Sequence, residues 1–116
     1  MISFSGALKI RLAVEPVDMR AGFERLSAMV AHVLGEDLRG GALYVFCNRR
    51  RTRLKVLCFD GTGTWLLCKR LEKGTFAWPK TAEIGTAKLV LAPEAFAMLT
   101  DGIDLRDGRM RPWYGR

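Results

Sequence analysis

Residues 42–72 read "ALYVFCNRRRTRLKVLCFDGTGTWLLCKRLE", three apolar runs separated by two turn signals. The second connection, "DGTG" at 60–63, is typical of a two-residue hairpin with Gly61 at the position that requires a positive φ. A four-residue loop at 49–52 similarly joins the first run to the second. These two turns predict an antiparallel meander in which Arg53 faces Arg70 across the sheet.

The two faces of this meander differ in chemistry. We expect the core face to carry nine side chains that alternate along the runs: Leu43, Val45, Cys47, Leu54, Val56, Cys58, Trp65, Leu67 and Leu71. The opposite face mixes aromatic and cationic side chains: Tyr44, Phe46, Arg53, Lys55, Leu57, Phe59, Leu66, Cys68 and Arg70. A slip of one residue would exchange the two faces.

Residues 18–34 predict an amphipathic helix that covers the core face of the meander. Its apolar stripe has helical spacing: Met19, Phe23, Leu26, Val30 and Val33. Asp18 is placed to accept the unpaired amide hydrogens of the first turn as N-cap. Gly35 supplies a left-handed residue that ends the helix.

The remaining pattern adds a strand at 7–14, a second strand at 87–92 and a short helix at 93–102. Pro93 suits the first position of that helix. Residues 74–85 predict a loop or edge segment, because Pro79 cannot donate to a strand ladder. The sequence therefore predicts a single α+β domain at 1–104, an antiparallel meander packed against an amphipathic helix with a second short C-terminal helix, followed by a basic tail at 105–116.

The chain is long enough to bury a core and is strongly basic. It has 116 residues, a net charge of +7 and a pI near 9.8. This balance favours contact with a polyanion: DNA, RNA or an acidic protein face. No apolar run is long enough to span a bilayer, and no secretion signal is recognisable, so we expect no membrane association and a cytoplasmic location.

The sequence offers little support for metal binding or catalysis. Cys47, Cys58 and Cys68 form no C-x-x-C pair, and the single histidine, His32, is distant from them. We interpret the cysteines as small apolar side chains on strands and expect no cofactor and no metal. The carboxylates are scattered, whereas a two-metal nuclease needs several that converge. We therefore expect the protein not to be an enzyme.

The arginine-rich turn is the strongest candidate for a binding site. Clustered arginines can be a solvated hairpin tip, but a pair of like charges across a sheet is destabilising unless an anion is present. A phosphate backbone would relieve the repulsion and release counterions. The candidate nucleic-acid-binding residues are Arg49, Arg50, Arg51, Arg53, Lys55, Lys69, Arg70 and Lys73.

Three aromatics share a face with these cations: Tyr44, Phe46 and Phe59. They can stack unpaired bases, as the aromatics of RNA-binding sheets do. They can equally dock a protein partner, or form a second small core beneath the C-terminal segment.

Four blocks of the sequence resemble, in order and spacing, the small TnpB or second-frame accessory protein of the sixty-sixth insertion-sequence family. They are "AVEPVDMRAGFERLSAMV", "LYVFCNRRRTRLKVLCFDGTG", "KRLEKGTFAWP" and "LAPEAFAMLTDGID", and the resemblance covers roughly residues 8–104. This family is unrelated to the RNA-guided nucleases that carry the same label.

The resemblance implies a bacterial mobile-element protein encoded beside a larger transposase, which carries the catalytic carboxylates. It implies no catalytic residues in this chain. Two hypotheses follow. One is a non-catalytic accessory protein in DNA transposition that binds nucleic acid at the element ends through the arginine hairpin. The other is an adaptor that docks on the transposase or another accessory protein without contacting DNA.

Overall fold

The computed structural model describes residues 8–79 and 85–102, and these form an α+β fold, as predicted. The expected basic tail at 105–116 lies outside the described residues. The elements in chain order are β1 (Ile10–Ala13), α1 (Phe23–His32), the 3-10 helix η1 (Leu38–Gly40), β2 (Leu43–Cys47), β3 (Arg53–Phe59), β4 (Thr64–Arg70), β5 (Lys88–Leu91) and α3 (Pro93–Thr100).

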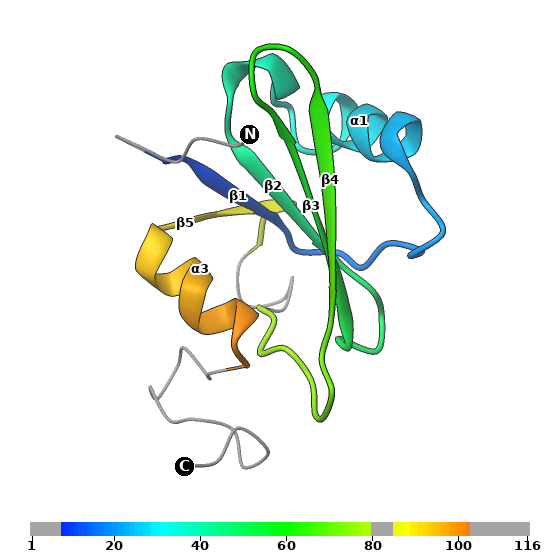
Figure 1. The fold of residues 1–116 in the computed structure, drawn as a ribbon, viewed down its shortest axis with the longest axis vertical. Helices are drawn as coiled ribbons and strands as arrows, with labels where there is room; N and C mark the ends of the chain where they lie inside the picture. The colour runs from blue at the N-terminus through cyan, green and yellow to red at the C-terminus, as the bar shows by residue number, and fades with distance from the viewer. Residues whose placement is uncertain (1–7, 80–84, 103–116) are drawn as a thin grey trace.

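One five-stranded sheet, in the order β4-β3-β2-β1-β5, organises the fold (Figure 1). β2, β3 and β4 form the predicted antiparallel meander, and β5 also runs antiparallel to its neighbour β1. β1 is parallel to β2, so the sheet is mixed. The segment from β1 to β2 contains α1, the usual form of a crossover between parallel strands.

The predicted register of the meander is confirmed. Arg53 pairs with Arg70 and Val56 pairs with Leu67 along β3 and β4. The turn between them closes through the bond from Asp60 N to Gly63 O, at 3.0 Å, and Gly61 has φ of +103°. The Asp60 carboxylate accepts from the Thr62 and Gly63 amides, and its other oxygen accepts from the Trp65 indole at 2.7 Å.

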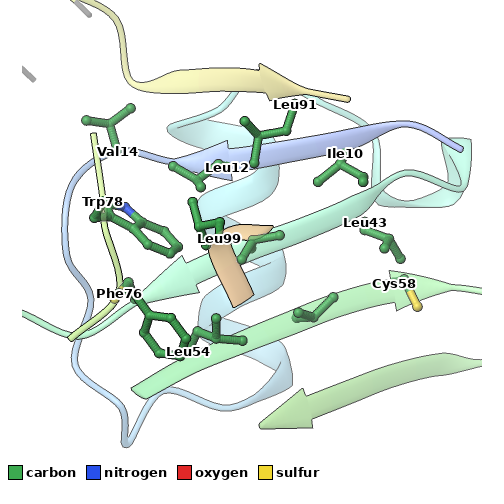
Figure 2. Close-up of a cluster of buried hydrophobic side chains, with 13 residues drawn as sticks. Ile10, Leu12, Val14, Leu43, Leu54, Cys58, Phe76, Trp78, Leu91 and Leu99 are labelled. Carbon is green, nitrogen blue, oxygen red and sulfur yellow. The ribbon is translucent and has the colours of Figure 1, made fainter. Parts of the chain in front are cut away.

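The prediction that α1 covers the core face of the meander is wrong, because both faces of the sheet are covered. The predicted core face packs instead against α3 and the 76–78 segment. Figure 2 shows Leu99 of α3 between Leu12 and Leu54, with Phe76 and Trp78 beside them. α1 lies on the opposite face, where Leu26 and Val30 pack on Tyr44, Phe46 and Leu57.

The helix also begins later than predicted. Gly22 is the N-cap residue, and no side chain of residues 8–79 or 85–102 caps α1 by a hydrogen bond. Asp18 instead accepts from Arg20 N at 2.8 Å, in a turn that precedes the helix. Met19 therefore lies outside α1. Phe23 and Val33, which belong to the predicted apolar stripe, are 50% and 51% exposed.

Gly35 is left-handed, as predicted, with φ of +66°, although α1 itself ends at His32, two residues before the predicted Leu34. The buried apolar side chains of this segment are Ala21, Leu26, Val30 and Leu34.

Glu36, just after α1, joins three strands by polar contacts. Its carboxylate accepts from Arg11 of β1 at 3.3 Å, from the Tyr44 hydroxyl of β2 at 3.2 Å and from the Lys88 ammonium of β5. The bond from Lys88 is the main reason that the pKa of Glu36 lies below its usual value. Burial and the charge of Glu36 raise the pKa of Tyr44 to about 12, so its hydroxyl stays protonated and donating.

Substitution of two apolar residues of α1, one buried and one half-exposed, should lower the free energy of unfolding by different amounts. Leu26→Ala empties a site that is 0% exposed and should lower the free energy of unfolding by about 2–5 kcal/mol. Phe23→Ala removes a half-exposed ring and should lower it by less than about 1 kcal/mol. Urea unfolding followed by circular dichroism measures both, and equal losses would contradict the placement of α1.

The Asp60 turn predicts a pH dependence of stability. The Thr62 amide first, then the Trp65 indole and the Gly63 amide, hold the pKa of Asp60 well below its usual range. A carboxyl whose pKa is lower in the folded state stabilises the fold when the pH is above the pKa of the unfolded state, about 3.9. This contribution is lost as the pH falls toward the pKa of the folded state. Asp60→Asn should therefore lower the urea midpoint at neutral pH and flatten its decline below about pH 4. Parallel declines for the wild type and the variant would show that Asp60 makes no such contribution.

Candidate nucleic-acid interface

The arginine turn between β2 and β3 is closed by the side chain of Asn48. Its Oδ1 accepts from the Thr52 amide at 2.9 Å and the Arg53 amide at 3.0 Å, while its Nδ2 donates to the Thr52 hydroxyl at 3.1 Å. Arg51 N donates to Asn48 O at 3.1 Å, and Arg51 has φ of +61°. The turn is therefore held by its own polar groups, although consecutive arginines repel each other.

Arg51 separates from the other arginines at this turn. Its guanidinium carbon lies 5.9 Å from the centroid of the Trp78 ring, on the α3 side of the sheet. Its carbonyl accepts from the Phe76 amide at 2.7 Å. One guanidinium nitrogen, Nη1, is buried and has no acceptor among the described residues. Arg51 thus anchors the 76–78 segment to the turn and is withdrawn from the predicted anion site.

The segment before α1 forms one wall of a hollow at the turn. Val17 N donates to Cys47 O at 2.9 Å, which places this segment beside the end of β2. The hollow, of about 430 Å³, is lined by Pro16, Val17, Asp18, Met19, Asn48, Arg49, Arg50 and Arg53.

A second hollow, of about 380 Å³, adjoins the first through Met19 and Arg53. It is lined by Met19, Arg53, Leu54, Lys55, Cys68, Lys69 and Arg70. We call the two hollows together the basic groove. Among the described residues that line it, six side chains are cationic and only Asp18 is acidic.

Asp18 is already paired and does not neutralise the groove. Its Oδ2 lies 2.7 Å from Arg20 Nη2, and the hydrogen bonds from Arg20 lower its pKa to about 2. Two of the groove cations have internal partners. Lys55 Nζ donates to Ala21 O at 2.8 Å, and Lys69 Nζ lies 3.6 Å from Asp101 Oδ1. Arg49, Arg50, Arg53 and Arg70 form no ion pair within residues 8–79 and 85–102.

Arg53 and Arg70 are held opposite each other in the closer kind of antiparallel pair. The bond from Asn48 N to Arg53 O turns the backbone of Arg53 toward β2. Arg53 and Arg70 therefore form a non-hydrogen-bonded pair, in which Cα atoms are about 4.5 Å apart and side chains approach most closely. Both side chains are exposed.

The structure gathers most of the predicted cationic site, but not all of it. Arg49, Arg50, Arg53, Lys55, Lys69 and Arg70 line the basic groove, although the Lys69 side chain reaches Asp101 at the end of α3, on the other face of the sheet. Arg51 points to the other face, and Lys73 is exposed beyond β4 without lining either hollow. The sequence interpretation missed the groove wall at Pro16–Met19, because it assigned Asp18 and Met19 to the helix.

The predicted aromatic surface is corrected by the position of α1. Tyr44 and Phe46 are 1% and 0% exposed beneath this helix, so neither ring is available to stack a base or meet a partner. Phe59 is half-buried, with the Arg39 guanidinium 5.4 Å from its ring centroid. Of the alternatives for these aromatics, the structure has the second small core, built under α1 and not under the C-terminal segment.

The cysteines and carboxylates form no metal cluster in the described part of the chain. Cys47, Cys58 and Cys68 are free thiols on β2, β3 and β4, with Cys68 exposed. No group of three or more His, Cys, Asp or Glu in residues 8–79 and 85–102 is arranged to hold a metal ion. Within the same residues, no helix has the length and apolar character needed to cross a membrane.

Comparison with known proteins identifies the family. The model of the family described as "IS66 Orf2 like protein" matches residues 8–110. The chain belongs to the IS66 Orf2-like family. It is therefore related to the second-frame proteins of insertion sequences.

Two relatives come from Sinorhizobium fredii (strain NBRC 101917 / NGR234). "Uncharacterized protein y4jC" is 36% identical over 112 residues, which cover 97% of this chain and 93% of the relative. "Uncharacterized protein y4hO" is 38% identical over 99 residues, covering 85% of this chain and 84% of the relative. No solved structure matches the chain significantly.

Removing a groove cation that has an internal partner should lower the free energy of unfolding more than removing an unpaired one. Lys55→Met keeps the alkyl stem but removes the bond to Ala21 O, so the free energy of unfolding should fall by about 1–2 kcal/mol. Arg49→Ala, at an exposed position with no ion pair in the described residues, should change it by less than about 0.5 kcal/mol. Chemical denaturation measures both, and a greater loss for Arg49→Ala would contradict the assignment.

Proposed function

We propose that this chain is a non-catalytic accessory protein of a bacterial insertion sequence, working in the cytoplasm, that supports DNA transposition by binding nucleic acid along the basic groove. The family supplies the context of a mobile element. The transposase encoded by the same element would supply the catalysis. The role of this chain is then to hold the phosphate backbone near the element ends.

The observation that carries the proposal is the unneutralised pair of Arg53 and Arg70. Like charges directly opposite in a sheet lower stability, and this pair has no acidic partner among the described residues. Arg49 and Arg50 add two further cations to the same groove. An arrangement that lowers the stability of the free protein becomes favourable when a polyanion occupies it and counterions are released.

Exposed guanidinium groups suit phosphate, since their planar donors match its oxygens. Contacts of this kind position a protein on a duplex but do not read its sequence. Proteins that bind single strands usually stack the bases on exposed aromatic side chains. No aromatic residue lines the basic groove among the described residues. We therefore propose duplex DNA, held by its backbone without base preference.

Fluorescence anisotropy with a labelled duplex from the element terminus tests the proposal between about 50 and about 200 mM salt. Arg49→Ala/Arg50→Ala should weaken binding and reduce the slope of log K against log salt by about 1 for each phosphate that the variant no longer neutralises. The matched control is Lys9→Ala/Arg39→Ala, which removes the same amount of charge at the other end of the meander. Lys9 lies there because its carbonyl accepts from Leu43 N at the start of β2, and Arg39 lies there because it contacts the ring of Phe59.

Equal affinities and equal salt slopes for the two double variants would reject the groove as the site. Tight binding of single-stranded RNA without binding of the duplex would reject DNA as the ligand. The adaptor hypothesis predicts a third result. The chain alone would not bind DNA, yet it would co-purify with the transposase almost independently of salt; because Tyr44 and Phe46 are buried, only Phe59 of the predicted docking aromatics could contribute to that contact.

A further inference from the structure

β4 is a long edge strand whose centre has no protection against pairing. It pairs with β3 over its whole length and with no other strand in the described residues. Figure 1 shows it at the end of the sheet opposite β5. Edge strands are commonly shielded by charged side chains, by proline, by a bulge or by brevity, and β4 has charged side chains only at its last two positions, Lys69 and Arg70. β4 has seven residues, no proline and an uninterrupted register from Thr64 to Arg70.

The hydrogen bonds of β4 to β3 determine which of its backbone groups face outward. Asp60 N bonds Gly63 O at one end of the hairpin, and Leu71 N bonds Thr52 O at the other, both at 3.0 Å. Because hydrogen-bonded and non-hydrogen-bonded positions alternate, the odd-numbered residues 65, 67 and 69 direct their N–H and C=O groups to β3. The even-numbered residues direct theirs away from the sheet: Thr64, Leu66, Cys68 and Arg70.

The side chains of β4 are apolar in the centre and basic at one end. Residues 65–68 read "WLLC", and Trp65 and Leu67 are 39% and 41% exposed although they lie on the face that α3 covers elsewhere. Cys68 is exposed on the other face. Lys69 and Arg70 follow at the end of the strand, while Asp60 bonds Trp65 near its start.

This pattern is complementary to itself in one register. When two copies of β4 run antiparallel with Leu67 opposite Leu67, every outward-facing residue meets another: Leu66 meets Cys68, and Thr64 meets Arg70. Lys69 of one copy then lies opposite Trp65 of the other, at the end that carries Asp60. The basic end of each copy thus meets the uncharged and acidic end of its partner. Parallel pairing would instead set Lys69 and Arg70 against like charges, which is destabilising.

We infer that two copies of this chain associate through β4, antiparallel, with Leu67 on the two-fold axis. Such an interface is isologous, as in most dimers of identical chains. The backbone hydrogen bonds supply affinity in the manner of strand addition, and Trp65 and Leu67 of the two copies bury one another on one face. The inference does not rest on the proposed DNA binding.

Sedimentation of the full chain tests the inference. The wild type should show a monomer–dimer equilibrium at up to about 100 μM, where a dimer with micromolar Kd is the main species. Leu67→Lys should raise Kd at least about tenfold, because it sets two ammonium groups opposite each other on the axis. Val90→Lys is the matched control, at an exposed residue of the other edge strand, and should leave Kd unchanged.

Leu67→Glu alone should also sediment as a monomer, and mixing it with Leu67→Lys should restore the dimer as a heterodimer, since opposite charges then meet on the axis. A wild type that stays monomeric, or a dimer that survives Leu67→Lys, would overturn the inference. So would a mixture that stays monomeric.

Disulfide trapping tests the register without relying on the charged variants. Leu67→Cys/Cys68→Ser should form an intermolecular disulfide under mild oxidation, because Cα atoms in a non-hydrogen-bonded pair lie about 4.5 Å apart. The native Cys68 should crosslink much less, since the diagonal separation of two Cys68 residues is about 7–8 Å. Equal crosslinking of the two proteins, or a failure of the double variant to crosslink, would overturn the register.

Discussion

Two side chains close the turns at the two ends of β3 and thereby set the register on which the structure depends. Asn48 accepts from the Thr52 and Arg53 amides before the strand, and Asp60 accepts from the Thr62 and Gly63 amides after it. A shift of one residue would exchange the two faces of the strand. With the register held, Arg53 must lie opposite Arg70, and Leu57 must face α1. Local hydrogen bonds thus maintain a charge pair that is unfavourable in the free protein.

The features with local causes could be predicted from the sequence. The "DGTG" turn, the pairing of the meander strands, the left-handed Gly35 and the start of the last helix at Pro93 each follow from a few neighbouring residues. The gathering of Arg49, Arg50, Arg53 and Arg70 followed from the register alone. Short blocks of sequence likewise indicate the family, and the family match over residues 8–110 agrees with them.

The features with long-range causes could not be predicted. Both faces of the meander carry large apolar side chains, so the pattern did not indicate which face α1 would cover; Phe76, Trp78 and Leu99 occupy the one first assigned to it. Arg51 has the same local signal as its neighbours, but the ring of Trp78, distant in sequence, holds it on the other side of the sheet. No sequence pattern indicates the polar contacts of Glu36, because its three partners come from three different strands.

The central claim is that the Arg53–Arg70 pair lowers the stability of the free protein and contributes to nucleic-acid binding. Arg70→Glu separates these two effects, since it replaces a repulsive cross-strand pair with an attractive one. The account predicts that this variant has a free energy of unfolding higher by about 0.2–1 kcal/mol and a weaker affinity for duplex DNA with a shallower salt slope. A variant that is no more stable than the wild type and binds DNA equally well would contradict it.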